Sequence, residues 1–219
     1  MRIRRKKWAK EELENSKFYI DKPDCYKNKW QEMFEDKDKP LHVEFGCGKG
    51  IFISTLAFKH RNINYIAVDM IEAMLGLSKR NIEETYNFEN PENLWLIRAN
   101  IEQISNVFGE DDNIDRIYIN FCNPWPKSKH NKRRLTHPRQ LEQYKTFLKP
   151  NGEIYFKTDD NELFEASLEY FETSGFKIIS NTFDLHKEPI FVENIETEHE
   201  KMFTNEGIKI KALIAVYNP

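Results

Sequence analysis

The stretch LHVEFGCGKG, residues 41–50, decides the fold because it joins a predicted strand to a predicted helix through three closely spaced glycines. The apolar run Leu41–Phe45 predicts a buried strand, and a helical pattern follows the last glycine. Gly46 and Gly48 allow the backbone to turn tightly and to approach a ligand closely, and Gly50 lets the helix begin against the strand. Doubly wound sheets bind ligands at turns of this kind, so we expect a ligand here.

The rest of the chain repeats this alternation of strand and helix. From residue 40 onward, short β-rich runs are separated by helical patterns, which predicts a mostly parallel sheet flanked by helices. The predicted strands are Leu41–Phe45, Tyr65–Val68, Leu94–Ala99, Arg116–Phe121, Glu153–Lys157, Phe176–Phe183 and Lys209–Tyr217. The predicted helices are Ile51–His60, Ile71–Tyr86, a short one at Ile101–Phe108, His137–Leu148, Asn161–Ser174 and Thr197–Asn205. We therefore expect an α/β, Rossmann-like fold with a seven-stranded sheet.

The length and composition predict one globular domain with an N-terminal extension. A chain of 219 residues with 39% hydrophobic residues can bury a single core of good size. Residues 1–35 precede the first predicted strand and form the extension, and residues 36–219 form the domain. The extension has a basic tip and two expected indole anchors, Trp8 and Trp30. Six basic residues precede its first acidic residue: Arg2, Arg4, Arg5, Lys6, Lys7 and Lys10.

Several classes of protein are disfavoured by the composition. The net charge of -3 says nothing about a polyanionic partner, so only the distribution of charge is informative. Three distant cysteines, Cys25, Cys47 and Cys122, match neither a disulfide framework nor a zinc site, and no His/Cys/Asp cluster suggests a metal. No apolar stretch has the length of a signal peptide or a membrane span. We expect a cytoplasmic protein without a metal.

The spacing of the glycines favours S-adenosylmethionine over a dinucleotide. A dinucleotide fingerprint needs G-x-G-x-x-G, and Ile51 stands where its third glycine would be, which disfavours a nicotinamide-dependent dehydrogenase. The G-x-G-x-G spacing is instead typical of methyltransferases. Asp69 ends the second predicted strand about 20 residues on, where a carboxylate accepts hydrogen bonds from ribose hydroxyls. Glu44 points to the same crevice and is expected to orient the methionyl part of the cofactor.

These residues also have simpler interpretations. The glycines can serve only as turn residues and Asp69 as a helix cap, because matches to glycine-rich patterns are loose. Asn100 follows the third predicted strand, where such folds contact the adenine, but it also fits a helix cap before Ile101. The predicted strand, the glycine turn, the predicted helix and Asp69 together favour a cofactor site over these simpler interpretations.

The stretch NFCNPWPKSKHNKRR, residues 120–134, passes from the fourth predicted strand into a basic loop. Its two prolines restrict the backbone, so we expect a stiff loop that holds a planar substrate. Trp125 is suited either to stack on a base or to fill the core. From Arg116 to Leu141 there are seven Lys/Arg residues and no acid, a pattern typical of a phosphate-binding surface or simply of a solvated face.

The chain resembles the bacterial tRNA (guanine-N7-)-methyltransferase family over nearly all its length. The matching motifs are RIRRKKW, HVEFGCGKG, NFCNPWPK followed by HNKRRLTHP, GEIYFKTDD and IETEHEKMF. The proline loop with its basic tail and the FKTD strand are specific, whereas the glycine turn is shared by many methyltransferases. The resemblance implies methyl transfer from S-adenosylmethionine to N7 of guanine 46 in the variable loop of tRNA.

The resemblance also implies roles for individual residues. Cofactor contacts are implied for Glu44, Gly46, Gly48, Gly50, Asp69, Asn100 and Asn123. Substrate contacts are implied for Lys127, Asp159, Thr197, Glu198, His199 and Glu200. RNA contacts are implied for Lys129, His130, Asn131, Lys132, Arg133 and Arg134. The four glutamates around residues 193–200 fit equally well the acidic first turn of a helix.

One departure from the family pattern concerns the chemistry. The family carries aspartate in the proline loop, F-S-D-P-W-P-K, where this chain has Asn123. Guanine N7 has a lone pair and no proton, so its attack needs no general base. A carboxylate would stabilise the positive charge that reaches the purine, and Asn123 offers only a carbonyl dipole. Asp159 is the expected remaining anion, so we expect Asn123 and Asp159 to act together in catalysis.

Two other functions stay open on the sequence alone. Asn-Pro-Trp-Pro resembles the N-P-P-aromatic loop of enzymes that methylate exocyclic amines, which makes an amine methyltransferase acting on nucleic acid the alternative enzyme. Asn123 also leaves room for a non-catalytic RNA-binding protein that retains the fold. The oligomeric state cannot be read from one sequence, because interface patches and core faces look alike.

Overall fold

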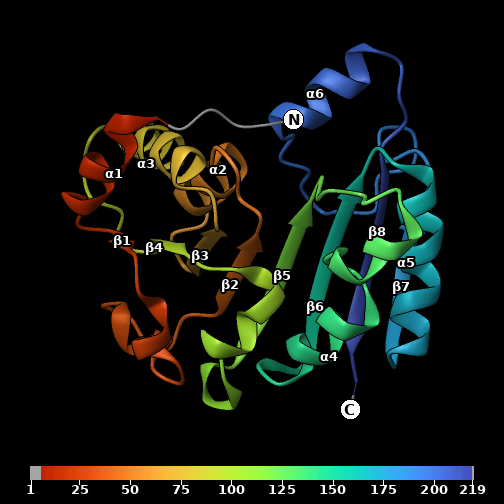
Figure 1. Ribbon diagram of the computed structural model, residues 1–219, viewed down its shortest axis with the longest axis horizontal. Coiled ribbons are helices and arrows are strands. Elements are labelled where there is room, and N and C mark those ends of the chain that lie inside the picture. The colour runs from red at the N-terminus through yellow and green to blue at the C-terminus, as the bar shows by residue number, and fades with distance from the viewer. Residues whose placement is uncertain (1–5, 219) are drawn as a thin grey trace. The chain divides into compact units, whose positions relative to one another are not determined.

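The computed structural model describes residues 6–218, which divide into two compact units, residues 6–112 and residues 113–218 (Figure 1). Arg2, Arg4 and Arg5 of the predicted basic tip lie outside the described residues. Within residues 6–218, no helix combines the length and the apolar character that crossing a membrane requires.

The first unit is built on four parallel strands. Their order is β1 (Tyr19–Ile20), β4 (Leu94–Arg98), β3 (Asn64–Asp69) and β2 (Leu41–Phe45). Every residue of β2 and β3 is buried, as expected for parallel strands that are covered on both faces. The helices α2 (Ile51–Lys59) and α3 (Glu72–Thr85) make the two crossover connections between β2, β3 and β4. The glycine turn therefore lies at the carboxyl end of β2, where β2 passes into α2.

The N-terminal extension packs into the first unit. Its helix α1 (Lys7–Glu14) lies against α3, where a Cβ on Gly76 would be 2.6 Å from the Cβ of Ala9. The short 3-10 helices η1 (Pro23–Tyr26) and η2 (Trp30–Met33) follow β1. The indole of Trp30 is fully buried and donates to the Val107 carbonyl oxygen at 3.0 Å. Trp30 is thus an anchor of the extension.

A buried carboxylate holds the extension at a second point. Asp112, in the 3-10 helix η4 (Glu110–Asp112), is fully buried and accepts from the backbone N–H groups of Asn28 at 2.9 Å and Trp30 at 3.1 Å. The backbone N–H of Gly109 donates to it at 2.8 Å. Burial raises the pKa of this carboxyl, and the three donors oppose that shift. These bonds tie the start of η2 to the loop that ends the unit.

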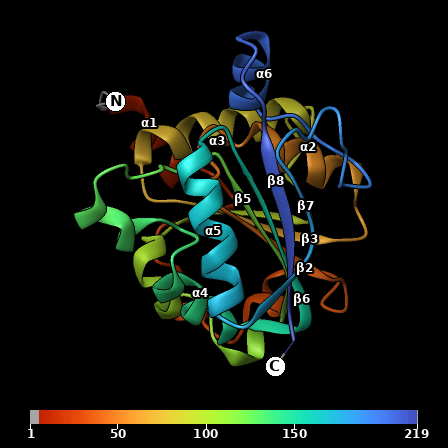
Figure 2. The ribbon, with the colours of Figure 1, turned by 90° about the vertical axis from the view of Figure 1, so that its right-hand side faces the viewer.

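The second unit combines parallel and antiparallel strands. β5 (Ile114–Asn120) and β6 (Leu148–Thr158) are parallel, and β8 (Lys211–Tyr217) pairs antiparallel with both β6 and β7 (Phe176–Thr182). Helix α5 (Asn161–Thr173) packs along β6, β7 and β8 (Figure 2). The other helices are η5 (Ser128–Arg133), α4 (Pro138–Lys145) and α6 (Glu198–Asn205), which lies beyond the carboxyl end of β6 (Figure 1).

The predicted α/β fold is confirmed, with one strand more than expected among the described residues. All seven predicted strands are present, and β1 is the eighth. Its two residues are too short a run to be recognised from sequence. The predicted short helix at Ile101–Phe108 is the 3-10 helix η3 (Ile101–Asn106). Within β6, Asn151 adopts a left-handed φ of 63°.

Candidate functional site

The glycine turn of the first unit is fixed to the end of β3. The backbone N–H groups of Gly46 and Cys47 donate to the Val68 carbonyl oxygen at 2.9 and 3.0 Å. Gly46, Gly48 and Gly50 have φ values of 80°, 55° and 71°, in the left-handed region that glycine adopts without strain. A side chain at Gly50 would also overlap Ser78 of α3. The local backbone therefore requires glycine here, as the sequence predicts.

Asp69 joins this turn to the start of α3. Its Oδ2 accepts from the Gly48 N–H at 3.0 Å, and its Oδ1 accepts from the Ile71 N–H at 2.8 Å. The side chain is 8% exposed, and burial raises the pKa of the carboxyl against these two hydrogen bonds. Asp69 thus accepts at the start of α3, which agrees with the simpler of the two roles considered from the sequence, and it also accepts from the glycine turn, which the sequence did not predict. Its contact with a ribose stays a prediction.

Negative charge surrounds the glycine turn. Glu44 is 2% exposed and lies one position before the end of β2. Burial raises the pKa of the Cys47 thiol strongly, and the charges of Asp69 and Glu44 raise it further. The two carboxylates are therefore close enough to act on one buried atom of the turn. Such a negative environment favours a cationic ligand.

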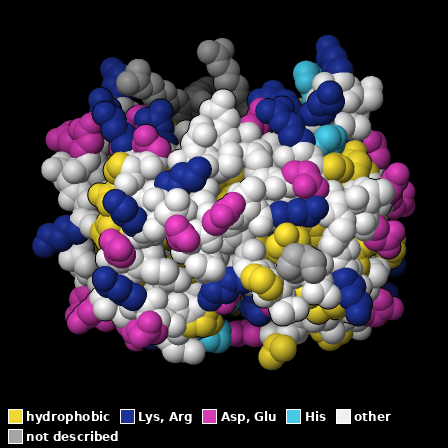
Figure 3. Space-filling view, turned by 90° about the horizontal axis from the view of Figure 1, so that it is seen from below, with side chains coloured by type: hydrophobic (Ala, Val, Ile, Leu, Met, Phe, Trp, Pro, Cys, Tyr) yellow, Lys and Arg dark blue, Asp and Glu magenta, His cyan; other side chains and the backbone are white. Residues whose placement is uncertain are grey.

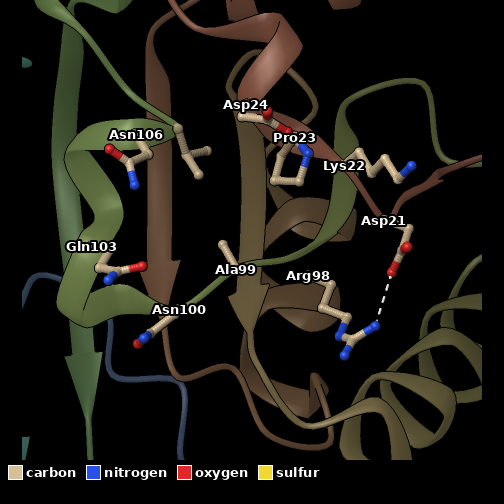
Figure 4. A pocket seen from close by; sticks show the side chains of 10 residues that line it. Asp21, Lys22, Pro23, Asp24, Arg98, Ala99, Asn100, Gln103 and Asn106 are labelled. Atoms are coloured by element: carbon tan, nitrogen blue, oxygen red, sulfur yellow. Dashed lines mark hydrogen bonds and ion pairs between the residues drawn. The ribbon is translucent and has the colours of Figure 1, made fainter.

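Asn100 lies at the rim of a cavity of about 240 Å³ in the first unit. Its Oδ1 accepts from the Glu102 N–H at 3.0 Å, so it caps η3, the simpler of its two predicted roles. In Figure 4, Gln103 and Asn106 come from η3 on one side, and Lys22, Pro23 and Asp24 come from the extension on the other. Asp21 and Arg98 form an ion pair at 3.2 Å along the wall. A contact between Asn100 and adenine stays a prediction.

The proline loop of the second unit begins in strained backbone. Phe121 and Trp125 have φ values of 51° and 46°, which are unfavourable for residues other than glycine. Asn123 is exposed, and its Oδ1 accepts from the Trp125 N–H at 3.1 Å. This hydrogen bond closes a local turn around Pro124. Asn123 is therefore part of the internal structure of the loop.

The buried side chain of Arg134 stabilises the same loop. Its Nε donates to the Pro124 carbonyl oxygen at 2.8 Å, and its Nη2 donates to Glu162 Oε1 at 2.8 Å. It is 1% exposed, unlike Lys129, Lys132 and Arg133 beside it. In this conformation the guanidinium of Arg134 does not reach the surface where a phosphate would bind. The sequence grouped it with the basic tract because charge pattern alone does not show burial.

Trp125 lies at the edge of the basic tract rather than in the core. Its ring is half-buried, with the Arg133 guanidinium 4.0 Å from the ring centroid and the His130 ring centroid 5.7 Å away. Lys127, Lys129 and Lys132 are exposed on and before η5. On the face of the molecule in Figure 3, Lys and Arg side chains are interspersed with Asp and Glu.

The predicted substrate residues of the C-terminal segment divide into two groups. Thr197 is 8% exposed and accepts from the Glu200 N–H at 3.0 Å, which caps α6. Glu200 is fully buried against Lys157. Glu198 and His199 face outward, and His199 stacks on Phe121 with ring centroids 6.2 Å apart.

Asp159 lies near His199 of this outward pair. It is half-buried, and burial raises the pKa of its carboxyl, which the charges of Lys211 and His199 oppose. Asp159 and His199, separated by 40 positions in the sequence, are therefore brought together. The sequence analysis gave Lys157 no role, because lysine is rarely buried and the sequence does not show its partner Glu200. Residues 6–218 contain no group of three His, Cys, Asp or Glu side chains arranged to hold a metal.

Comparisons with known proteins agree with these features. A family model described as a putative methyltransferase matches residues 38–213. The tRNA (guanine-N(7)-)-methyltransferase of Clostridium beijerinckii is 56% identical over 218 residues, which are 99% of each chain. That of Ruminiclostridium cellulolyticum is 53% identical and covers 99% of this chain and 92% of its own length.

Solved structures of lower identity support the fold. The 16S rRNA methyltransferase KamB gives a TM-score of 0.61 at 12% identity, over 86% of this chain and 91% of its own. The 16S rRNA (adenine(1408)-N(1))-methyltransferase from Catenulisporales acidiphilia gives 0.59 at 15% identity, over 90% and 92%. At these identities the similarity concerns the fold alone. The match to the family model and the identity over the full length show that the chain belongs to the tRNA (guanine-N(7)-)-methyltransferase family of methyltransferases.

Proposed function

We propose that this enzyme transfers the methyl group of S-adenosylmethionine to N7 of guanine 46 in the variable loop of tRNA. The observation that carries this function is the 56% identity, over 99% of both chains, to a relative named for guanine-N7 methylation of tRNA. Position 46 follows from the resemblance of the proline loop and its basic tail to that family. The protein is proposed to work in the cytoplasm, where tRNA is modified.

The first unit is proposed to hold S-adenosylmethionine. The glycine turn lets the backbone approach a ligand closely, and the carboxylates of Glu44 and Asp69 match a donor whose sulfonium and ammonium groups are positive. When bound, this cofactor supplies a methyl group on a positively charged sulfur. Gly46, Gly48, Gly50 and Asn100 complete the proposed contacts of this unit, and a cofactor contact of Asn123 stays a proposal that rests on the family resemblance.

The second unit is proposed to present the guanine. N7 uses its lone pair to form the bond to the methyl carbon as the sulfur–carbon bond breaks, so the purine becomes positive and no proton moves. Asp159 would stabilise that charge as a carboxylate, and Asn123 would contribute a weaker dipole. Lys127, Thr197, Glu198 and His199 are proposed to contact the base or its neighbours. Trp125 offers a partly exposed ring on which a base can stack.

The identity to relatives named for guanine-N7 methylation disfavours the alternative amine methyltransferase, and the acceptors that it would use have partners within the chain. Such enzymes use the Asn side chain and a proline carbonyl to accept the hydrogens of an exocyclic amine. Here Asn123 Oδ1 already accepts from the Trp125 N–H, and the Pro124 carbonyl oxygen accepts from Arg134 Nε. A reaction at N7 needs neither acceptor, because N7 carries no hydrogen.

Residues on the surface are proposed to hold the tRNA backbone. Lys129, His130, Asn131, Lys132 and Arg133 would contact phosphates and sugars, which position the RNA without reading its sequence. Residues 1–35 are proposed to act as an extension of a methyltransferase domain over residues 36–219, with the basic tip on the tRNA. Deletion of residues 1–10 is expected to weaken tRNA affinity, and unchanged affinity would show that the tip takes no part in binding.

The function is tested by mapping the product. The purified protein is incubated with unmodified tRNA and labelled S-adenosylmethionine, and 7-methylguanosine is located by borohydride reduction and aniline cleavage. We expect cleavage at guanine 46 only. Label on adenine N6 or guanine N2 would identify an amine methyltransferase, and tRNA binding without any label would identify a non-catalytic RNA-binding protein.

A further inference from the structure

The buried ammonium of Lys157 donates hydrogen bonds to three residues of the segment 194–200. Nζ donates to Asn194 Oδ1 at 3.1 Å, to the Ile195 carbonyl oxygen at 3.1 Å and to Glu200 Oε2 at 2.7 Å. A lysine ammonium has three donors, so this one segment supplies acceptors for all of them. Lys157 is 3% exposed and Glu200 0%, which removes the contact from solvent. The side chain therefore links the end of β6 to the start of α6.

Glu200 is held by further groups of the second unit. Its Oε1 accepts from Asn194 Nδ2 at 2.7 Å, and His186 Nε2 lies 3.2 Å from the same oxygen. Its backbone N–H donates to Thr197 Oγ1. Both carboxylate oxygens thus serve groups of the chain itself. Glu200 is therefore suited to holding the segment rather than to touching a substrate.

This link fixes where the outward residues of α6 lie. Lys157 precedes Asp159 by two positions at the end of β6, and the charge of His199 acts on the Asp159 carboxyl. From the other side, His199 stacks on Phe121 at the end of β5. A buried ion pair is rarely more stabilising than apolar side chains of the same volume, but it fixes a specific geometry. Its presence here is better explained by orientation than by stability.

We propose that Lys157, acting through Glu200, is a positioning residue that holds His199 beside Asp159 and keeps Glu198 on the outward face of α6 for recognition of the guanine. The inference rests on the proposed function, because it concerns the substrate side of that same site. Lys157 and Glu200 themselves touch neither substrate nor cofactor in this account.

The test removes the ion pair without leaving a buried charge. In the double variant Lys157→Met/Glu200→Leu, kcat/KM for tRNA is expected to fall about tenfold or more, because small misplacements of binding groups are costly. The dissociation constant for S-adenosylmethionine and the melting temperature are expected to stay near those of the parent. A matched control, Arg116→Met/Glu153→Leu, removes a different ion pair, in which Arg116 Nε donates to Glu153 Oε2 at 2.8 Å. This pair lies closer to the start of β6, so the control should leave kcat/KM unchanged.

Each outcome decides the proposal. A double variant that methylates tRNA with the kcat/KM of the parent would overturn it. If the double variant does not fold, Glu200→Gln is decisive: the shape is kept, but the amide cannot accept from Asn194 and Lys157 together as the carboxylate does. Parental kcat/KM in Glu200→Gln would then overturn the proposal, and a fall at unchanged cofactor affinity would support it. An inactive parent protein would instead reject the proposed function.

Discussion

At the scale of single residues, Asn123 is a position where the charge of the proposed site can be changed while the hydrogen bond that shapes the loop is kept. Its Oδ1 accepts from the Trp125 N–H at 3.1 Å, within the turn around Pro124. A carboxylate oxygen of aspartate accepts the same hydrogen bond, so Asn123→Asp adds a charge and leaves the loop in place.

We therefore expect Asn123→Asp to raise the turnover number about tenfold, since an ionised acceptor interacts about twice as strongly as a neutral one. Steady-state assays with saturating tRNA and labelled cofactor measure this directly. Asn151→Asp, at an exposed turn in left-handed backbone, is the matched control and should have the parental rate. A turnover that stays the same or falls in Asn123→Asp would show that charge at this position does not assist the transfer.

The raised pKa of Asp159 predicts how the methylation rate depends on pH. Burial raises the pKa of this carboxyl above the ordinary 3.8, and the carboxylate is the form that stabilises a positive purine. As the pH falls, the proton therefore neutralises Asp159 earlier than it would an exposed aspartate, and kcat should decline with a midpoint above 3.8. In Asp159→Asn the acid decline should vanish at a lower plateau rate. An identical acid limb in parent and variant would assign it to another group.

The burial of individual charged residues could not be predicted from the sequence. Arg134 and Glu200 belong to a basic tract and an acidic cluster, and nothing in those patterns separates them from their exposed neighbours. Their partners, Glu162 for one and Lys157 for the other, lie 28 and 43 positions away. Contacts at such separations depend on the tertiary fold. The three glycines of the turn could be predicted, because their left-handed backbone is a local requirement.

At the scale of elements, the turn between β2 and α2 depends on backbone that only glycine adopts easily. Gly50 precedes α2 with a φ of 71°, and a side chain there would overlap Ser78 of α3. Gly207 after α6 has a φ of 76°, and no atom lies within 4 Å of the point where a Cβ would stand. A side chain at either position would be placed in unfavourable left-handed backbone, but only at Gly50 would it also overlap other atoms.

Gly207→Ala should lower the free energy of unfolding by about 1 kcal/mol, the cost of left-handed backbone. Gly50→Ala should cost about 2 kcal/mol or more, since overlap with α3 adds to that penalty. Denaturant unfolding and calorimetric titration with S-adenosylmethionine compare the two. We expect weaker cofactor binding only in Gly50→Ala, and equal binding in both variants would show that this turn does not hold the cofactor.

Helices and strands with a clear hydrophobic pattern could be predicted from the sequence, and short elements could not. The strand Leu41–Phe45 and the start of α2 at Ile51 agree with the predicted bounds, because a buried run and a glycine turn mark them. The helix α1 has few apolar residues, and Ala9 and Leu13 become buried only by packing in the first unit. Because charged residues predominate in this stretch, the sequence analysis described it only as part of an extension with a basic tip and did not predict a helix.

At the scale of the whole molecule, the net charge of -3 conceals a local basic surface. Lys129 and Lys132 are exposed on η5, and Arg133 is exposed beside the Trp125 ring. Because phosphate contacts release counterions, each is expected to add about 0.7 to 0.9 to the slope of log affinity against log salt concentration.

Replacing Lys129, Lys132 and Arg133 by Gln should therefore lower the tRNA salt slope by about 2 to 3. Arg134→Gln should leave the slope unchanged, since this side chain is buried. The control Lys17→Gln/Lys37→Gln/Lys177→Gln removes the same charge from exposed positions elsewhere. Filter-binding isotherms from low to high salt provide the slopes, and equal losses in the test and control variants would mean that the η5 residues have no special role.

The central claim, that guanine N7 is the atom methylated, is tested most directly by a tRNA with 7-deazaguanine at position 46. This base keeps every exocyclic group but has a carbon in place of N7, so it lacks the lone pair that attacks the methyl group. The account predicts that the tRNA binds with near-normal affinity and accepts no label, while the matched guanine transcript is methylated fully. Label transfer to the 7-deazaguanine tRNA at the normal rate would contradict it.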